Sequence, residues 1–226
     1  MSENNGSSVF IEMLRGRDGL PGRDGVQGLP GPAGTTGKQG PTGPKSGGAT
    51  YTRWGKSTCP ELEGTELVYS GITGGTLYNQ PGGGANYLCM PKDPEYSTTL
   101  SYRGGVNEHA TIYGAEYESP LRQDASQHNA PCAVCYVSTR PTVIMIPAKA
   151  SCPPSWIREY YGYIMTQYKG FKRTMFECVD RDQEALPGSH ANTDGVTFWH
   201  VEASCNGLPC DPYDPNKELN CAVCTK

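Results

Sequence analysis

The chain has 226 residues, a net charge of −4 and a hydrophobic share of 36%, together with 29 glycines, 19 prolines and 10 cysteines. No block of like charge offers a footprint for nucleic acid or anionic lipid, so neither partner is expected. The longest apolar run, Val143 to Ile146, is far shorter than the ~20 residues of a membrane-spanning helix, so no membrane partner is expected either.

The N-terminal segment, residues 1–15, has no charged stretch followed by an apolar core, so it does not read as a signal peptide. Because other features indicate secretion, we expect that a leader is removed from the mature chain. Asn5 begins the tripeptide Asn5-Gly6-Ser7, which fits the acceptor pattern for N-glycosylation.

A strict triplet repeat occupies residues 16–45, with glycine at every third position: Gly16, Gly19, Gly22, Gly25, Gly28, Gly31, Gly34, Gly37, Gly40 and Gly43. Three polyproline-II-like chains can wind together only where the axial residue has no side chain, and this requirement produces a Gly-X-Y period. The repeat therefore predicts a collagen triple helix. Pro21 and Pro30 occupy Y positions, where hydroxylation would favour the helix. A disordered Gly/Pro-rich linker is the alternative, but a linker has no reason to keep a period of three.

This stalk is too short and too poor in proline to trimerise unaided. Thirty residues give a rod of roughly 90 Å. We therefore expect an adjoining domain to hold three chains together, which raises the effective concentration of the stalk segments. The expected partner is the chain itself, as a homotrimer, with head-to-head assembly and other matrix components as further partners.

A cysteine-rich head follows a linker at residues 46–50, and it repeats itself. Residues 51–140 are the expected first subdomain and residues 141–226 the second. Cys-Ala-Val-Cys occurs twice, at 132–135 and 221–224, each time 43 residues after the cysteines Cys89 and Cys178. Two similar subdomains that complete one another, related by a pseudo-twofold axis, are expected.

Runs of β-branched and aromatic residues between turn signals predict an all-β, disulfide-rich head. The predicted strands are Leu67–Tyr69, Tyr87–Cys89, Thr111–Tyr113, Val143–Ile146, Tyr160–Met165, Met175–Phe176 and Val196–Val201. The run 143–146 lies between two prolines and is expected to be a buried strand that joins the two halves.

The cysteines are predicted to form disulfides, since their number is even and the collagen repeat implies an oxidising compartment. The simplest scheme pairs Cys59 and Cys89 with Cys132 and Cys135 in the first copy, and Cys152 and Cys178 with Cys221 and Cys224 in the second. Cys205 and Cys210 are left to close a small loop. The order within each copy stays open, as do bridges between copies or chains. Zinc ligation or redox chemistry at the Cys-x-x-Cys motifs is the weaker reading, because the two motifs lie 89 residues apart.

No catalytic residue, metal site or cofactor is expected. The pairs Asp93/Glu95 and Asp182/Glu184 were weighed as calcium ligands, although such pairs are more often solvated loop residues. The four histidines show no ligand spacing, and no nucleophile elbow or phosphate loop is present.

The chain resembles the short-chain collagens of sponges, cnidarians and other invertebrates. The resemblance is carried by the stalk, by the motifs at 51–56, 66–71 and 85–89, and by the two Cys-Ala-Val-Cys boxes. More distantly, the Cys-Pro openings and tandem halves are similar to the C-terminal non-collagenous domain of type IV collagen, although the cysteine spacing differs. The resemblance implies a secreted extracellular-matrix protein whose head trimerises.

The sequence is compatible with two functions. The leading expectation is a structural matrix protein, without enzymatic activity, in which the heads drive trimerisation and join stalks into a matrix or fibres. The alternative is a soluble recognition protein, in which the stalk clusters three lectin-like heads and gains avidity. The segment Gln80-Pro81-Gly82 lacks the acidic partner of a collectin-like sugar site, which weighs against the second.

Overall fold

In the computed structural model, residues 19–31, 33–34, 37, 47–96, 110–119 and 123–226 are described. The chain divides into two units, 1–42 and 43–226, which are treated separately below. Several predicted features lie outside the described residues, namely Asn5, the stalk positions Gly16, Gly40 and Gly43, and residue 46 of the linker. The rest of the predicted linker at 46–50 is described, and its last two residues, Ala49 and Thr50, already belong to a strand.

The described part of the stalk is extended and has no regular secondary structure. A Cβ added to any of the described glycines from Gly19 to Gly37 would meet nothing within 4 Å. Leu20, Val26 and Leu29 are almost fully exposed. A triple helix forms only when three chains associate, so it stays a prediction here.

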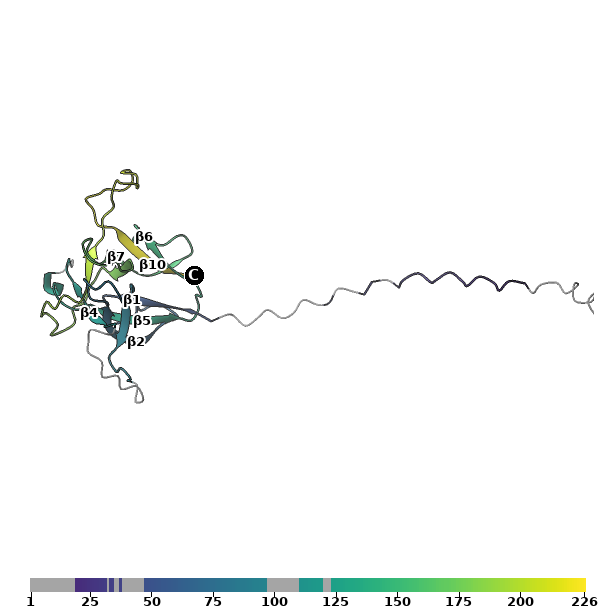
Figure 1. The fold of residues 1–226 in the computed structure, drawn as a ribbon, viewed down its shortest axis with the longest axis horizontal. Helices are drawn as coiled ribbons and strands as arrows, with labels where there is room; N and C mark the ends of the chain where they lie inside the picture. Colours follow the sequence, from purple (N-terminus) through teal and green to yellow (C-terminus); the bar gives the residue numbers. More distant parts are fainter. Residues whose placement is uncertain (1–18, 32, 35–36, 38–46, 97–109, 120–122) are drawn as a thin grey trace, which may run out of the picture. The chain divides into compact units, whose positions relative to one another are not determined.

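The head is an all-β domain (Figure 1). Its described residues form five strands in each half. The first copy contains β1 (Ala49–Trp54), β2 (Thr65–Gly75), β3 (Leu88–Pro91), β4 (Tyr113–Tyr117) and β5 (Pro131–Val137). The second copy contains β6 (Val143–Pro147), β7 (Ile157–Thr166), β8 (Glu177–Asp180), β9 (Val196–His200) and β10 (Asn220–Thr225).

The two copies pair their strands in the same way. In the first, β5 lies between β1 and β2, and β2 also pairs with β3 and β4. In the second, β10 lies between β6 and β7, and β7 also pairs with β8 and β9. The internal repeat in the sequence is therefore a repeat of topology.

The registers match residue by residue, so equivalent positions can be named. Tyr51 of β1 faces Cys135, and Ile144 of β6 faces Cys224. Each copy has a β-bulge in the same place, at Val68 in the first and at Glu159 in the second. These correspondences are used below.

The cysteine pairing follows from this register. Five disulfides are present: Cys59–Cys135, Cys89–Cys132, Cys152–Cys224, Cys178–Cys221 and Cys205–Cys210. Side chains at positions i and i+3 of a strand point to opposite faces of the sheet. Cys132 and Cys135 on β5 therefore reach different partners, and neither Cys-x-x-Cys motif forms a local dithiol pair or one side of a shared metal site.

Some of the strand predictions were wrong in detail. Met175 and Phe176 precede β8 instead of forming a strand, and β4 begins only at Tyr113. Strands β1, β5 and β10 were not predicted. The run at β6 is a strand, as predicted, but it is not buried in the chain, because it lies at the edge of the sheet, where Ile144 and Met145 are 36% and 38% exposed.

Two apolar clusters form the core. One contains Trp54, Tyr87, Tyr117 and Phe198, and so combines residues of both copies. The other contains Tyr51, Tyr160 and the disulfides Cys59–Cys135 and Cys178–Cys221. In the described residues, no helix is long and apolar enough to cross a membrane.

Candidate assembly interface

The two copies meet along a seam formed by β1 of the first copy and by β7 and β8 of the second. Trp54 at the end of β1 pairs in parallel with Val179 of β8. Beside this bridge, the backbone N–H of Glu184 donates to the carbonyl of Gly55 at 2.9 Å. Tyr51 stacks on Tyr160, with ring centroids 6.1 Å apart.

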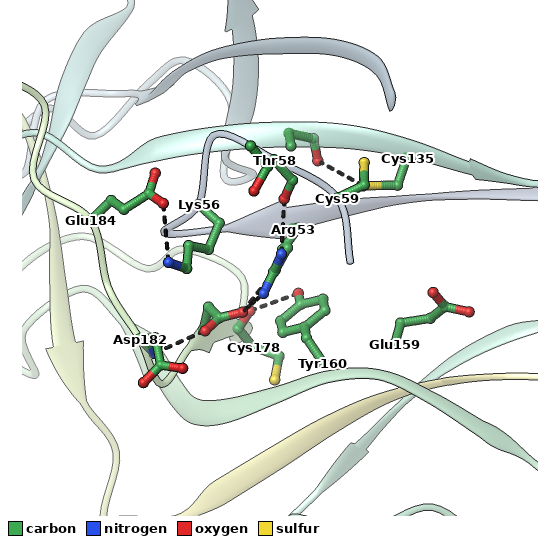
Figure 2. Close-up of polar contacts among 12 residues, drawn as sticks. Arg53, Lys56, Thr58, Cys59, Cys135, Glu159, Tyr160, Cys178, Asp182 and Glu184 are labelled. Carbon is green, nitrogen blue, oxygen red and sulfur yellow. Dashed lines mark hydrogen bonds and ion pairs between the residues drawn. A yellow bond between two sulfur atoms is a disulfide. The ribbon is translucent and has the colours of Figure 1, made fainter. Parts of the chain in front are cut away.

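Two ion pairs cross the seam (Figure 2). Arg53 contacts the buried carboxylate of Asp180, with both Nε and Nη2 at 2.8 Å from Oδ2. Lys56 Nζ lies 3.0 Å from Glu184 Oε1. Burial alone would raise the pKa of Glu184, but hydrogen bonds from Ser57 and Lys56 hold it below its usual value.

A third carboxylate, Glu159, is fully buried at the β-bulge of β7. Its Oε1 accepts hydrogen bonds from Arg140 at 3.0 Å and from Thr225 at 2.6 Å. Its Oε2 accepts from the hydroxyls of Tyr51 and Thr65 at 3.0 and 3.1 Å. With four donors, the buried charge is compensated, as an ionised group away from water requires.

Trp54 completes the seam by donating from Nε1 to Glu177 Oε2 at 2.9 Å. Burial raises the pKa of Glu177, and this hydrogen bond opposes the rise. Beside the stacked rings of Tyr51 and Tyr160, the seam thus contains several charged and polar side chains that find partners in the other copy.

The seam joins different surfaces of the two copies. β6 is the equivalent of β1, and β3 is the equivalent of β8. A pseudo-twofold axis that places β1 against β8 would therefore also place β6 against β3. In the described residues, however, β6 pairs with β10 alone and β3 with β2 alone. The expected twofold relation is therefore wrong for this contact, which is head-to-tail. A head-to-tail contact leaves one unused edge on each copy.

The unused edge of the first copy is apolar and exposed. Val68, equivalent to buried Glu159, is 55% exposed, and Leu88, equivalent to Glu177, is 40% exposed. Tyr69 donates to the carbonyl of Cys89 at 3.0 Å, just as Tyr160 donates to that of Cys178 at 2.8 Å. The first copy therefore keeps the geometry of the seam while presenting it to solvent.

The unused edge of the second copy is β6. Its Ile144, Met145 and Ile146 stand where β1 has Tyr51, Thr52 and Arg53. After each strand the chain takes a positive φ, at Gly55 (84°) and at Ala148 (58°). The two edges thus retain the shape of the seam and replace most of its charges by apolar side chains: Ile146 and Pro91 stand for Arg53 and Asp180, and Val68 and Leu88 for Glu159 and Glu177.

A second contact between the copies is also head-to-tail. Ala115 and Glu116 of β4 pair in parallel with Val196 and Thr197 of β9. The bridges Glu116↔Asn129 and Glu202↔Glu218 show that Glu202 is the equivalent of Glu116. In the described chain, residues 201–203 have no strand in the place that β9 takes beside β4.

The acidic pairs weighed as calcium ligands do not form one site. Glu184 pairs with Lys56. The backbone N–H of Asp182 donates to the carboxylate of Asp180. The structure instead brings together Glu116, Glu118 and Asp194, whose carboxylate oxygens lie within 4.8 Å of one another. No local motif predicts this cluster, because Asp194 is far along the chain from Glu116 and Glu118.

Among the histidines, His128 and His190 approach one another, with ring centroids 5.7 Å apart. His200 stacks on Tyr163 at 5.2 Å. Burial lowers the pKa of His200, and Glu218 and Glu202 oppose this effect. No ligand spacing had been predicted for these residues.

Five disulfides are typical of an extracellular or secreted protein. Comparison of the chain with protein-family models and with curated proteins finds no match.

Proposed function

We propose that this protein is a secreted, short collagen-like structural protein whose head drives trimerisation. In this proposal the seam between the two copies of one chain is repeated between chains. The second copy of each chain places β6 against β3 in the first copy of the next. The observation that carries the proposal is the pair of unused edges, which are equivalent to the two sides of a seam already formed within the chain.

The repeated seam has specific expected contacts. Lys149 is equivalent to Lys56, and Glu95 to Glu184, so Lys149 of one chain would pair with Glu95 of the next. Both residues are exposed within the chain. Where Arg53 meets Asp180 in the seam, Ile146 would meet Pro91. An apolar contact is suited to an interface between chains, because burying apolar surface drives association without the desolvation cost of charges.

The second head-to-tail contact would be repeated in the same direction. Residues 201–203 of one chain would pair with residues 110–112 of the next, as 115–117 pair with 196–198 within the chain. The adjoining cleft of about 630 Å³ would then be covered by the next chain on the side formed by Trp199, His200 and Glu202.

A head-to-tail contact closes into a ring when its rotation allows, and forms an open filament otherwise. The Gly-X-Y stalk selects three chains, because a collagen helix has three strands. A trimeric head would hold the stalks close enough for a short, proline-poor helix to form. Assembly of such trimers into a matrix or fibres is the expected use.

The test is the native mass of the oxidised protein, measured by light scattering with and without residues 1–46. We expect three chains in both samples. Ile144→Glu places a charge on β6 at a residue that is 36% exposed and should give single chains, whereas Thr52→Ser on the covered strand β1 should leave the trimer intact. A wild-type head that is monomeric at all concentrations would refute the proposal.

A charge exchange tests the register of the contact. Lys149→Glu should weaken the trimer, since it sets two carboxylates against one another, and adding Glu95→Lys should restore it. If the double variant is no stronger than the single one, the two residues do not meet across the chains.

A further inference from the structure

A cleft of about 380 Å³ lies between the two copies of one head, and it shares one wall, residues 167 and 171–174, with the larger cleft beside Trp199 and His200. One wall is the loop between β2 and β3, residues 76–87, and the other is the loop between β7 and β8, residues 167–176. The loops are fastened by hydrogen bonds from Lys172 N to Tyr78 O at 3.0 Å and from Met175 N to Ala85 O at 2.9 Å. Tyr78 and Phe171 also pack together, with centroids 4.4 Å apart. The cleft is therefore built by the fold of a single chain.

The charged groups that line this cleft are both cations, Lys172 and Arg173. Both are exposed, and no ion pair joins either of them to a carboxylate in the part of the chain that the structure describes. Two uncompensated positive charges facing one small cleft favour an anionic ligand.

The neutral groups of the cleft are mostly hydrogen-bond donors. Gln167 uses its side-chain carbonyl to accept from Thr197 N and Oγ1, at 2.9 and 2.5 Å, which leaves its NH₂ group to donate. Gly82, Gly83 and Gly84 also line the cleft, and they have no side chains to fill it. Gly83 has φ +96°, a conformation that glycine adopts readily. The Gly84 carbonyl is occupied by the hydroxyl of Thr76 at 2.8 Å.

We propose that this cleft binds a sulfate-bearing saccharide. Lys172 and Arg173 would hold the sulfate with charge-assisted hydrogen bonds, the glycine amides and Gln167 would donate to the remaining oxygens, and Phe171 would pack against the sugar ring. A sulfated polysaccharide is favoured over a nucleic acid because the five disulfides place the head in an oxidising, extracellular setting.

The site exists once per chain. The loop 76–87 of the first copy carries no charged residue, whereas the loop 167–176 of the second carries Lys169, Lys172 and Arg173 and no acid. A trimer would therefore present three sites, and a long polysaccharide could occupy more than one of them with increased avidity.

Binding of a chondroitin sulfate hexasaccharide to the intact chain, measured by calorimetry at physiological salt, tests the proposal. We expect saturable binding, with a desulfated hexasaccharide binding at least tenfold more weakly. Lys172→Ala and Arg173→Ala should each weaken binding by about five- to tenfold, as expected for the loss of one charge-assisted contact. Lys169→Ala is the matched control, because Lys169 lies in the same loop but lines only the larger cleft, whereas Lys172 and Arg173 line both.

Gly82→Glu gives a second, independent test. A Cβ at Gly82 would meet nothing within 4 Å, so the fold should tolerate the change, while the new carboxylate should repel the sulfate. Native mass is measured for every variant, so a failure to assemble is distinguished from a failure to bind. Equal weakening by Lys169→Ala would indicate diffuse attraction and overturn the proposal. So would equal binding of the desulfated sugar, or of a single-stranded DNA oligonucleotide of equal charge.

Discussion

Strands β1 and β6 occupy the same place in the two copies but meet different surroundings. β1 is covered by the second copy and carries Arg53, which pairs with buried Asp180. β6 has the same register against its own neighbour, yet it is open and carries Ile144 to Ile146. In the proposed trimer, the contact formed within each chain would be polar, while the edge that meets a separate chain would be mostly apolar.

The residues at the two β-bulges, Glu159 and Val68, differ in the same way. Glu159 is buried and bound by four donors from both copies, whereas Val68 at the equivalent position is exposed. A carboxylate can be buried there only because its partners belong to the same chain and are always present. Valine needs no partner, so it can face solvent before association and be covered afterwards.

The largest expected effect on stability comes from removing the disulfides that occupy equivalent places in the two copies. Cys89–Cys132 and Cys178–Cys221 have the same sequence separation, 43 residues. Replacing either pair by alanine should lower the free energy of unfolding by about 4 kcal/mol from chain entropy, against about 2 kcal/mol for the short loop closed by Cys205 and Cys210. Guanidinium unfolding at fixed protein concentration measures the three losses, and a large inequality between the first two would show that the copies are not equally stable.

The next largest effect on stability is expected from Arg140, which neutralises Glu159, a buried charge that the first copy lacks. Arg140→Met leaves Glu159 buried without its cation and should cost about 3 kcal/mol of unfolding free energy. Adding Glu159→Val, which recreates the first copy's Val68, should recover most of the loss. Lys217→Met, which breaks an exposed pair with Asp214, should cause no measurable loss. No recovery in the double variant would contradict the comparison of Glu159 with Val68.

Much of this arrangement could be predicted from the sequence, since the repeated cysteine motifs are local patterns. The separation from Cys89 to Cys132 and the matching box at 221–224 identified which cysteines share a copy. Their order was not predictable, because it depends on which face of β5 each cysteine occupies, and β5 was not recognised as a strand. The boxes contain only short alanine–valine cores, which give a weak β-strand signal.

The seam was not predictable for a different reason. Arg53 and Asp180 are far apart in the chain, and nothing local indicates that they pair. The burial of β6 was inferred from its apolar run alone, but hydrophobicity does not say whether a surface is covered by its own chain or by another. The cleft between the loops combines residues of both copies and carries no motif.

Two lysine substitutions with smaller expected effects distinguish the seam within the chain from the proposed seam between chains. Lys56→Met removes a partly exposed pair and should lower the free energy of unfolding by about 0.5 kcal/mol after solvent screening, without changing the trimer. Lys149→Met should leave the stability of single chains unchanged and weaken the trimer a few-fold. Urea unfolding and sedimentation velocity, applied to both variants, distinguish the two roles. Identical behaviour of the variants would mean that the two lysines are not used differently.

The smallest effect comes from His200, which stands where the first copy has Gly114. Burial lowers the pKa of His200, so the unfolded chain, with an ordinary pKa of about 6.5, binds the proton more readily than the folded chain. The stability that His200 contributes is therefore complete above about pH 6.5 and is lost as the pH falls below it, with a slope of at most about 1.4 kcal/mol per pH unit. His200→Gln should make the free energy of unfolding depend less on pH between about pH 7.5 and 5.5. Subtracting the free energy of unfolding of the variant from that of the wild type at each pH removes the contributions of the carboxylates. A steeper decline in the variant would mean that His200 is protonated in the folded head, stabilised by Glu202 and Glu218, and that burial is not the dominant influence on its pKa.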